Sequence, residues 1–251
     1  MTNEQYFEYL IRLGDTPLIL SHRLGEWCGH GPILEEDLAL TNTALDYVGQ
    51  CTNAFKKAGE VEGKGRDEDD IAFVRLEREY KNFLIAELPK GDYAFTVCRQ
   101  FLFSTWYYLF LKQLNQSKDE FMVAFADKSI KEVKYHWQHS SDWVKRLGDG
   151  TEESHQKMQT ALNEIWEFTG ELFINDAIDQ AAIAAGIGVD LAALKPEWDT
   201  IINQVLDEAT LTRPADGHAQ IGGRLGRHTE YMGYLLSELQ YMQRAYPNAK
   251  W

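Results

Sequence analysis

Residues 92–114 read DYAFTVCRQFLFSTWYYLFLKQL, a stretch that indicates a helix buried on nearly every side. Aromatic and aliphatic side chains occur at almost every angle around a period of about 3.6 residues, which leaves little room for a water-facing stripe. No Asp or Glu occurs from Tyr93 to Lys118, so this helix brings no negative charge into its surroundings. A helix of this composition predicts the centre of an all-α protein.

The segment after Pro32 shows the clearest helical repeat in the rest of the chain. Its apolar residues recur at alternating steps of about four and three, which is the spacing of an inward seam on a long bundle helix. The seam consists of Leu34, Leu38, Thr41, Leu45, Val48, Thr52 and Phe55. Strand-like alternation is hard to find. The sequence therefore predicts a ferritin-like four-helix bundle with additional N- and C-terminal helices, as a single domain over residues 1–251.

Breaks at glycine and proline set the expected helix limits. The core helices are expected at about 33–58, 70–88, 92–114 and 118–147. The peripheral helices are expected at about 3–28, 151–185, 196–211 and 225–246. Within the first of these, Gly14 is expected to stop the helix and Asp15 is expected to cap a new one.

The composition excludes several classes of function. A formal net charge of -14 repels a phosphate backbone, which argues against nucleic-acid binding. Three cysteines without a C-x-x-C pair argue against a disulfide framework and a zinc site, and they fit a reducing compartment. Neither a signal peptide nor an apolar run long enough to cross a bilayer is recognisable, so the protein is expected to be cytoplasmic.

A ferritin-like di-iron site takes one Glu from each of two helices and a Glu-x-x-His motif from each of the other two. Of the 7 histidines, His155 alone has a Glu three residues before it, at Glu152. That pair directly follows the Gly148–Gly150 break, so it lies at a helix start and not at mid-bundle. Since residues 93–118 also lack a carboxylate, the sequence predicts the scaffold of an oxygenase without its metal.

A rival interpretation is a metal-dependent oxidoreductase with an atypical ligand set. Glu77 and Glu132 each precede a Tyr by three residues, which is the di-iron motif with Tyr in place of His. His136 and His139 form the closest histidine pair, and together with Glu132 they could bind a metal. The ordinary alternative is that the glutamates flank their helices and the histidines hydrogen-bond within a core or an interface.

A third interpretation concerns residues 222–227, which read GGRLGR. The stretch lacks the Lys-Ser/Thr of a phosphate-binding P-loop and any preceding strand. It could still hold an anion, such as a CoA phosphate, at the start of the last helix. The alternative is a glycine-rich lead-in to that helix.

Five sets of residues carry a likeness to known proteins. They are His22–Pro32 with Leu34–Asp37, Leu88–Ala94 with Arg99–Leu102, Lys131–His136, Gly222–Glu230 and Glu238–Tyr241. Together they span nearly the whole chain, and they resemble the C subunit of bacterial phenylacetyl-CoA epoxidases, the PaaC family.

The resemblance implies a ferritin-like subunit that binds no iron itself, with no metal ligand, no cofactor-binding residue and no catalytic residue of its own. In that family the chain pairs with a homologous A subunit, which holds the di-iron site and binds the CoA thioester. The assembled monooxygenase uses O2 and electrons from an NADPH-dependent reductase subunit to epoxidise the ring of phenylacetyl-CoA. The expected role of this chain is therefore that of a structural subunit in aerobic phenylacetate catabolism.

Overall fold

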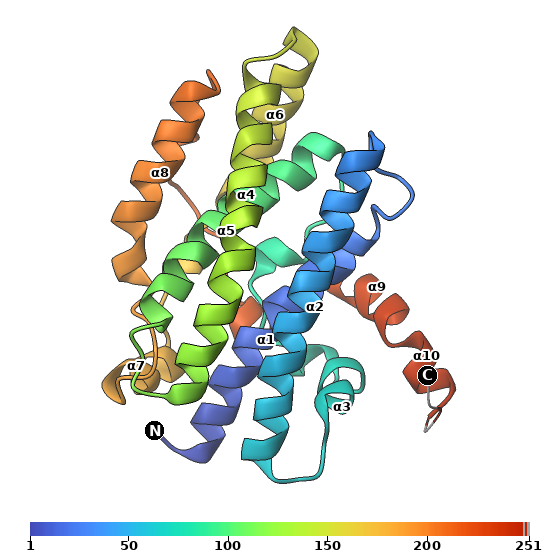
Figure 1. Ribbon diagram of the computed structural model, residues 1–251, viewed down its shortest axis with the longest axis vertical. Coiled ribbons are helices and arrows are strands. Elements are labelled where there is room, and N and C mark those ends of the chain that lie inside the picture. Colours follow the sequence, from blue (N-terminus) through green and yellow to red (C-terminus); the bar gives the residue numbers. More distant parts are fainter. Residues whose placement is uncertain (248, 250–251) are drawn as a thin grey trace. The chain divides into compact units, whose positions relative to one another are not determined.

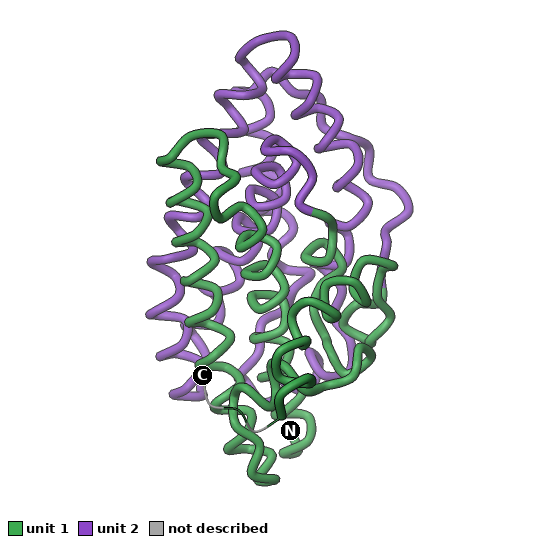
Figure 2. The backbone as a smooth tube through the Cα atoms, turned by 90° about the vertical axis from the view of Figure 1, so that its right-hand side faces the viewer, with its two compact units in different colours: residues 1–89, 222–251 green, residues 90–221 purple. Residues whose placement is uncertain are grey.

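The computed structural model describes residues 1–247 and 249 and confirms the predicted all-α class (Figure 1). This part of the chain is 72% helical, with ten α-helices and no strand. Two compact units divide the chain, one from Met1–Pro89 with the segment from Gly222 onward and the other from Lys90–Ile221 (Figure 2). They are called unit 1 and unit 2 below. The expectation of a single domain stays a prediction.

Two long helices, α1 (Asn3–Gly25) and α2 (Leu34–Glu62), run side by side and supply most of the helical structure of unit 1 (Figure 1). A capping box between Thr2 and Gln5 starts α1. The remaining elements of unit 1 are short. They are α3 (Glu68–Phe73), η1 (Glu77–Glu79), η2 (Leu84–Ala86), η6 (Gly223–Leu225), α9 (Glu230–Leu239) and α10 (Tyr241–Ala245).

The expected break at Gly14 is wrong, because α1 continues through Gly14 and contains Pro17. Gly14 is a packing position: a Cβ placed there would lie 2.3 Å from Cε1 of Phe55 on α2. Asp15 does not cap a helix either, since it lies inside α1, where its side chain is fully buried. The glycine thus allows α1 and α2 to approach closely, and α1 is the main partner of α2 and not a peripheral helix.

The expected core helix at 70–88 is also wrong, since α3 ends at Phe73 and only short 3-10 turns follow. Backbone donors in this segment bond to side chains in place of carbonyls four residues back. Lys81 N–H donates to Asp15 at 2.6 Å, and Phe83 N–H donates to the Thr16 hydroxyl at 3.1 Å. These tertiary bonds satisfy the backbone without a helix, so the apolar spacing of the segment is misleading.

Unit 2 is built on α4 (Tyr93–Leu114) and α5 (Glu120–Gly148), which pack along each other. Within α4 only Lys112 and Gln113 are exposed, which confirms the prediction of a buried helix. The indole of Trp198 donates to the Leu102 carbonyl at 3.1 Å and joins α8 to α4. The other elements of unit 2 are α6 (Glu152–Ile165), η3 (Trp166–Phe168), η4 (Gly170–Phe173), α7 (Ala177–Ala184), η5 (Ala192–Leu194) and α8 (Lys195–Glu208).

Two further expected helices are interrupted. The one at 151–185 breaks after α6, and Asp176 starts α7 by accepting from the N–H groups of Ile178 and Asp179. The one at 225–246 begins only at Glu230, because Gly226 adopts a left-handed φ of 75° and ends η6. Two pairs of long helices, α1 with α2 and α4 with α5, nevertheless follow each other along the chain, with a connecting segment between the pairs. This is the chain order of a ferritin-like bundle.

The close approach at Gly14 can be tested with a matched pair of glycine variants. Gly14→Ala should lower the free energy of unfolding by about 1–3 kcal/mol, because the new methyl group must displace Phe55. Gly49→Ala, inside α2 with nothing within 4 Å of the added Cβ, should raise it by up to about 1 kcal/mol. Urea denaturation measures both, and equal effects of the two substitutions would contradict this packing.

Candidate functional site

The residues of the rival metal set lie on two different elements. Glu77 is exposed in η1 of unit 1, whereas Glu132, His136 and His139 belong to α5 of unit 2. His139 stacks on Tyr135 with ring centroids 5.7 Å apart. Within residues 1–247 and 249, no group of three or more His, Cys, Asp or Glu side chains could hold a metal ion.

The donor set therefore does not fit a carboxylate-bridged di-iron centre. Such a centre needs carboxylates from its core helices, and α4 carries none. The exposed Glu77 also faces water and not a bundle interior. The absence of metal, cofactor-binding and catalytic residues from this chain stays a prediction, which is taken up below.

The lone Glu-x-x-His motif has a local role at a helix end. Nδ1 of His155 lies 2.7 Å from the carbonyl oxygen of Gly148, the last residue of α5. Glu152 is exposed in the first turn of α6, where the negative charge of its side chain interacts favourably with the helix dipole. The pair thus joins two consecutive helices, as its position after the glycine break indicates.

The glycine-rich stretch 222–227 packs against the backbone of residues 78–84. A Cβ at Gly223 would lie 2.3 Å from the Asn82 carbonyl oxygen, and one at Gly226 would lie 2.2 Å from that of Arg78. The N–H groups of Leu225 and Gly226 donate to carbonyls within the stretch itself. The glycines are therefore explained by close packing, and the stretch does not start a long helix as an anion site there would require.

A fully buried carboxylate, Glu87, anchors this glycine-rich stretch to the rest of unit 1. Its Oε1 accepts from the Asn82 amide at 2.8 Å and lies 2.6 Å from Nδ1 of His228, whose side chain is also fully buried. Its Oε2 accepts from both the N–H and the hydroxyl of Thr229 at 2.7 Å. The Arg23 guanidinium donates to the Glu87 carbonyl at 2.7 Å. This network holds three distant segments together.

A second buried charge pair joins Asp15 of α1 to Arg75, and both side chains are almost completely shielded from water. Nη1 of Arg75 donates to Asp15 at 3.0 Å and to the Glu79 carbonyl at 2.9 Å. The guanidinium also lies 4.1 Å from the ring centroid of Tyr80. Burial raises the pKa of Tyr80 to about 12, so its hydroxyl stays neutral, and Gln240 donates to it at 2.8 Å.

The prediction that this seam of α2 faces inward is wrong, because most of its large side chains face solvent. The exposed fractions are 71% for Leu34, 54% for Leu38, 61% for Leu45 and 43% for Val48. A different stripe packs inward within the structure: Leu40, Ala44, Tyr47, Cys51, Ala54, Phe55 and Ala58. Since α2 is apolar along two stripes, periodicity alone does not show which one packs within the chain.

The exposed side chains Leu34, Leu38, Leu45 and Val48 are called the α2 row. They lie on one face of one helix, at the spacing with which packed helices contact each other. An exposed apolar row of this kind marks an interaction site more often than an ordinary surface. A groove of about 580 Å³ opens beside the row, and Val48 belongs to both. The α2 row is therefore the candidate functional site.

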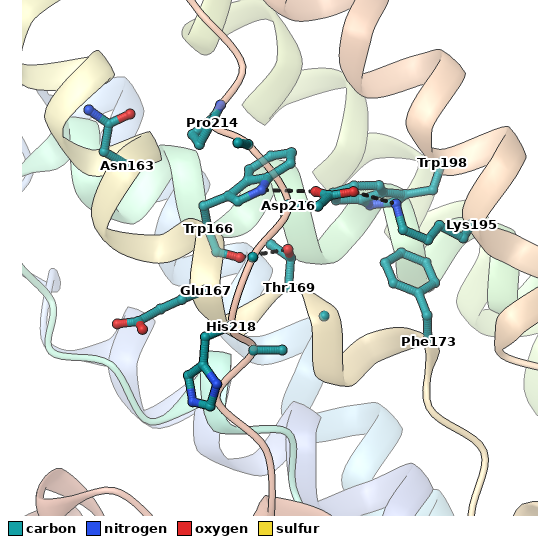
Figure 3. Close-up of a pocket in the computed structure, with 14 residues that line it drawn as sticks. Asn163, Trp166, Glu167, Thr169, Phe173, Lys195, Trp198, Pro214, Asp216 and His218 are labelled. Atoms are coloured by element: carbon teal, nitrogen blue, oxygen red, sulfur yellow. Dashed lines mark hydrogen bonds and ion pairs between the residues drawn. The ribbon is translucent and has the colours of Figure 1, made fainter.

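Unit 2 contains a pocket of about 330 Å³ lined by η3, η4, α8 and the loop after Leu211 (Figure 3). Lys195 in its wall bonds to Asp199 at 2.9 Å and to Asp216 at 3.3 Å. Asp216 also accepts from the Trp166 indole at 3.1 Å, as Figure 3 shows. These bonds fasten the loop over the aromatic side chains, so the pocket is a structural junction.

The buried pair in unit 1 predicts an asymmetric response to removal of charge. Asp15→Asn should cost about 3–5 kcal/mol of unfolding free energy, because it leaves the Arg75 guanidinium buried without a counter-charge. Glu153→Gln, in an exposed pair with Lys157, should leave stability unchanged within error. Thermal and urea unfolding of both variants check this, and an unaffected Asp15→Asn variant would contradict the burial described.

Two comparisons with known proteins indicate the same family. The profile of the family PaaA_PaaC, described as "Phenylacetic acid catabolic protein", matches residues 1–251. The chain is also 45% identical over 247 residues to the C subunit of the 1,2-phenylacetyl-CoA epoxidase of Escherichia coli (strain K12). That match covers 98% of this chain and 99% of the relative. The chain therefore belongs to the PaaA_PaaC family of phenylacetic acid catabolic proteins.

Proposed function

We propose that the chain is the non-catalytic structural subunit of a multicomponent di-iron phenylacetyl-CoA epoxidase. In this role it pairs with the iron-bearing A subunit and supports it during aerobic phenylacetate catabolism. The relative's name, at 45% identity over 98% of this chain, supports membership of such a complex. A reductase subunit that delivers electrons from NADPH and a cytoplasmic location belong to the same proposal.

The observation that carries the pairing is the α2 row. Four large aliphatic side chains on one helix remain between 43% and 71% exposed, although α2 packs closely on α1 along its other stripe. Burying one such side chain contributes about 1.5–3 kcal/mol. A homologous subunit of the same helical fold offers helices whose ridges fit a row at this spacing.

The donor set supports the non-catalytic part of the proposal. The buried carboxylates of Asp15 and Glu87 take their hydrogen bonds from the protein, and they hold segments together. On α4 there is no Asp or Glu that could bridge two metal ions. The di-iron centre is accordingly assigned to the A subunit, and no cofactor is assigned to this chain.

An iron analysis tests where the metal is held. The purified chain, reconstituted with ferrous iron and desalted, should retain far less than one iron per chain, whereas its complex with the A subunit should retain iron. Elemental analysis and the visible spectrum measure both. Glu132→Ala should leave the activity of the complex unchanged. Tight stoichiometric iron in the isolated chain would reject the proposal in favour of the metal-dependent oxidoreductase.

A pair of double variants tests the pairing surface. Leu38→Ser/Leu45→Ser should weaken binding of the A subunit at least about tenfold, since two side chains lose their burial. Ile174→Ser/Ile221→Ser removes two aliphatic side chains of similar exposure, 45% and 51%, from unit 2 and should change the affinity less than about twofold. Titration calorimetry measures both affinities, and equal losses would exclude the α2 row as the site.

A further inference from the structure

The groove beside the α2 row lies within unit 1, among α1, α2, α3 and α9. Its apolar floor is formed by Leu18, Phe55, Ala72, Phe73 and Leu239. Val48 and Thr52 of α2 also line it, so the apolar surface continues from the row into the groove. The row spans about 21 Å along α2, at about 1.5 Å per residue from Leu34 to Val48. Row and groove together are long enough for a helix of about four turns.

The rim of this groove carries negative charge. The carboxylates are Glu26, Glu68, Asp69 and Glu238, and the described lining residues include neither Lys nor Arg. His22 also lines the groove, and burial lowers its pKa, so the ring is neutral at pH 7. Glu26 bonds to Arg23 at 2.7 Å, which leaves Glu68, Asp69 and Glu238 to dominate the local field. Burial raises the pKa of Asp69, and the adjacent carboxylates Asp67 and Glu68 raise it further.

We propose that this groove receives an amphipathic helix of the A subunit. The apolar side of that helix packs on the floor and the α2 row, and its Lys or Arg side chains pair with Glu68, Asp69 and Glu238. The inference rests on the proposed function and adds the chemistry of the partner segment. A helix laid into an apolar groove, with basic residues at its edge, fits both the shape and the charge.

Charge favours this occupant over the alternatives. A second copy of the chain would bring a further net charge of -14 to an acidic rim. An anionic ligand such as a CoA thioester meets the same repulsion. The rim carboxylates belong to no group of three or more described His, Cys, Asp or Glu side chains that could hold a metal ion. A basic segment of a partner protein is the occupant that both floor and rim attract.

Charge reversal at the rim tests the proposal. The variant Glu238→Lys changes one exposed side chain near the end of α9, where a cation suits the helix dipole, so the fold should remain intact. The variant Glu68→Lys/Asp69→Lys/Glu238→Lys reverses the three rim carboxylates other than Glu26, which is paired with Arg23. Its matched control, Asp142→Lys/Glu164→Lys/Asp207→Lys, makes the same change of net charge on exposed positions of unit 2. Circular dichroism and thermal unfolding verify each fold.

The readout is the affinity for the purified A subunit at low and at high salt. Glu238→Lys should weaken binding about threefold to tenfold, the triple rim variant more than about tenfold, and the unit 2 control less than about twofold. Salt should weaken the wild-type complex, and this dependence should be smaller for the rim variants, because fewer charge pairs remain to be screened.

The outcomes separate the two proposals. If the wild-type chain binds the A subunit and both rim variants bind equally well, the groove proposal is overturned and the pairing stands. If the wild-type chain does not bind the A subunit at all, both fall together. If the chain alone sediments as a dimer that the rim variants dissociate, the groove is an interface between copies, which also overturns the proposal.

Discussion

Burial of charge is the constraint on which unit 1 depends. A carboxylate removed from water is costly unless hydrogen-bond donors or a counter-charge compensate it. Asp15 obtains both from Arg75 and the Lys81 N–H, whereas Glu87 is held by hydrogen bonds with Asn82, His228 and Thr229. These two networks fix α1, the irregular segment 74–88 and the C-terminal segment in place. A ferritin-like scaffold with an iron centre compensates its inner carboxylates with metal, whereas here protein groups do so.

The two apolar stripes of α2 have different surroundings. One stripe of the helix packs against α1, where Gly14 permits close contact with Phe55. The other stripe, the α2 row, remains largely exposed to water within the described residues. A second apolar stripe on a helix is typical of an interaction surface. The buried networks and this exposed row both support the proposed role as a scaffold for a partner.

Sequence patterns predict α4, α5 and the start of α2 to within two residues, because each helix is long and strongly periodic. The end of α2 lies at Glu62, four residues beyond the expected limit. They fail for residues 70–88, where backbone donors reach side chains of α1 that lie 66 and 67 positions away in the chain. The buried pairs are likewise hidden: Arg75 lies 60 positions from Asp15, and His228 lies 141 from Glu87. No local spacing encodes such partners. The α2 row is visible in the sequence, but its direction depends on which stripe α1 covers.

A crystal structure of the chain with its A subunit, recorded at the iron absorption edge, would locate both the iron and the surface that covers α2. We expect an anomalous iron signal within the A subunit alone, with Leu38 and Leu45 buried beneath that subunit. An iron signal coordinated by side chains of this chain, or an α2 row still open to solvent in the complex, would contradict it.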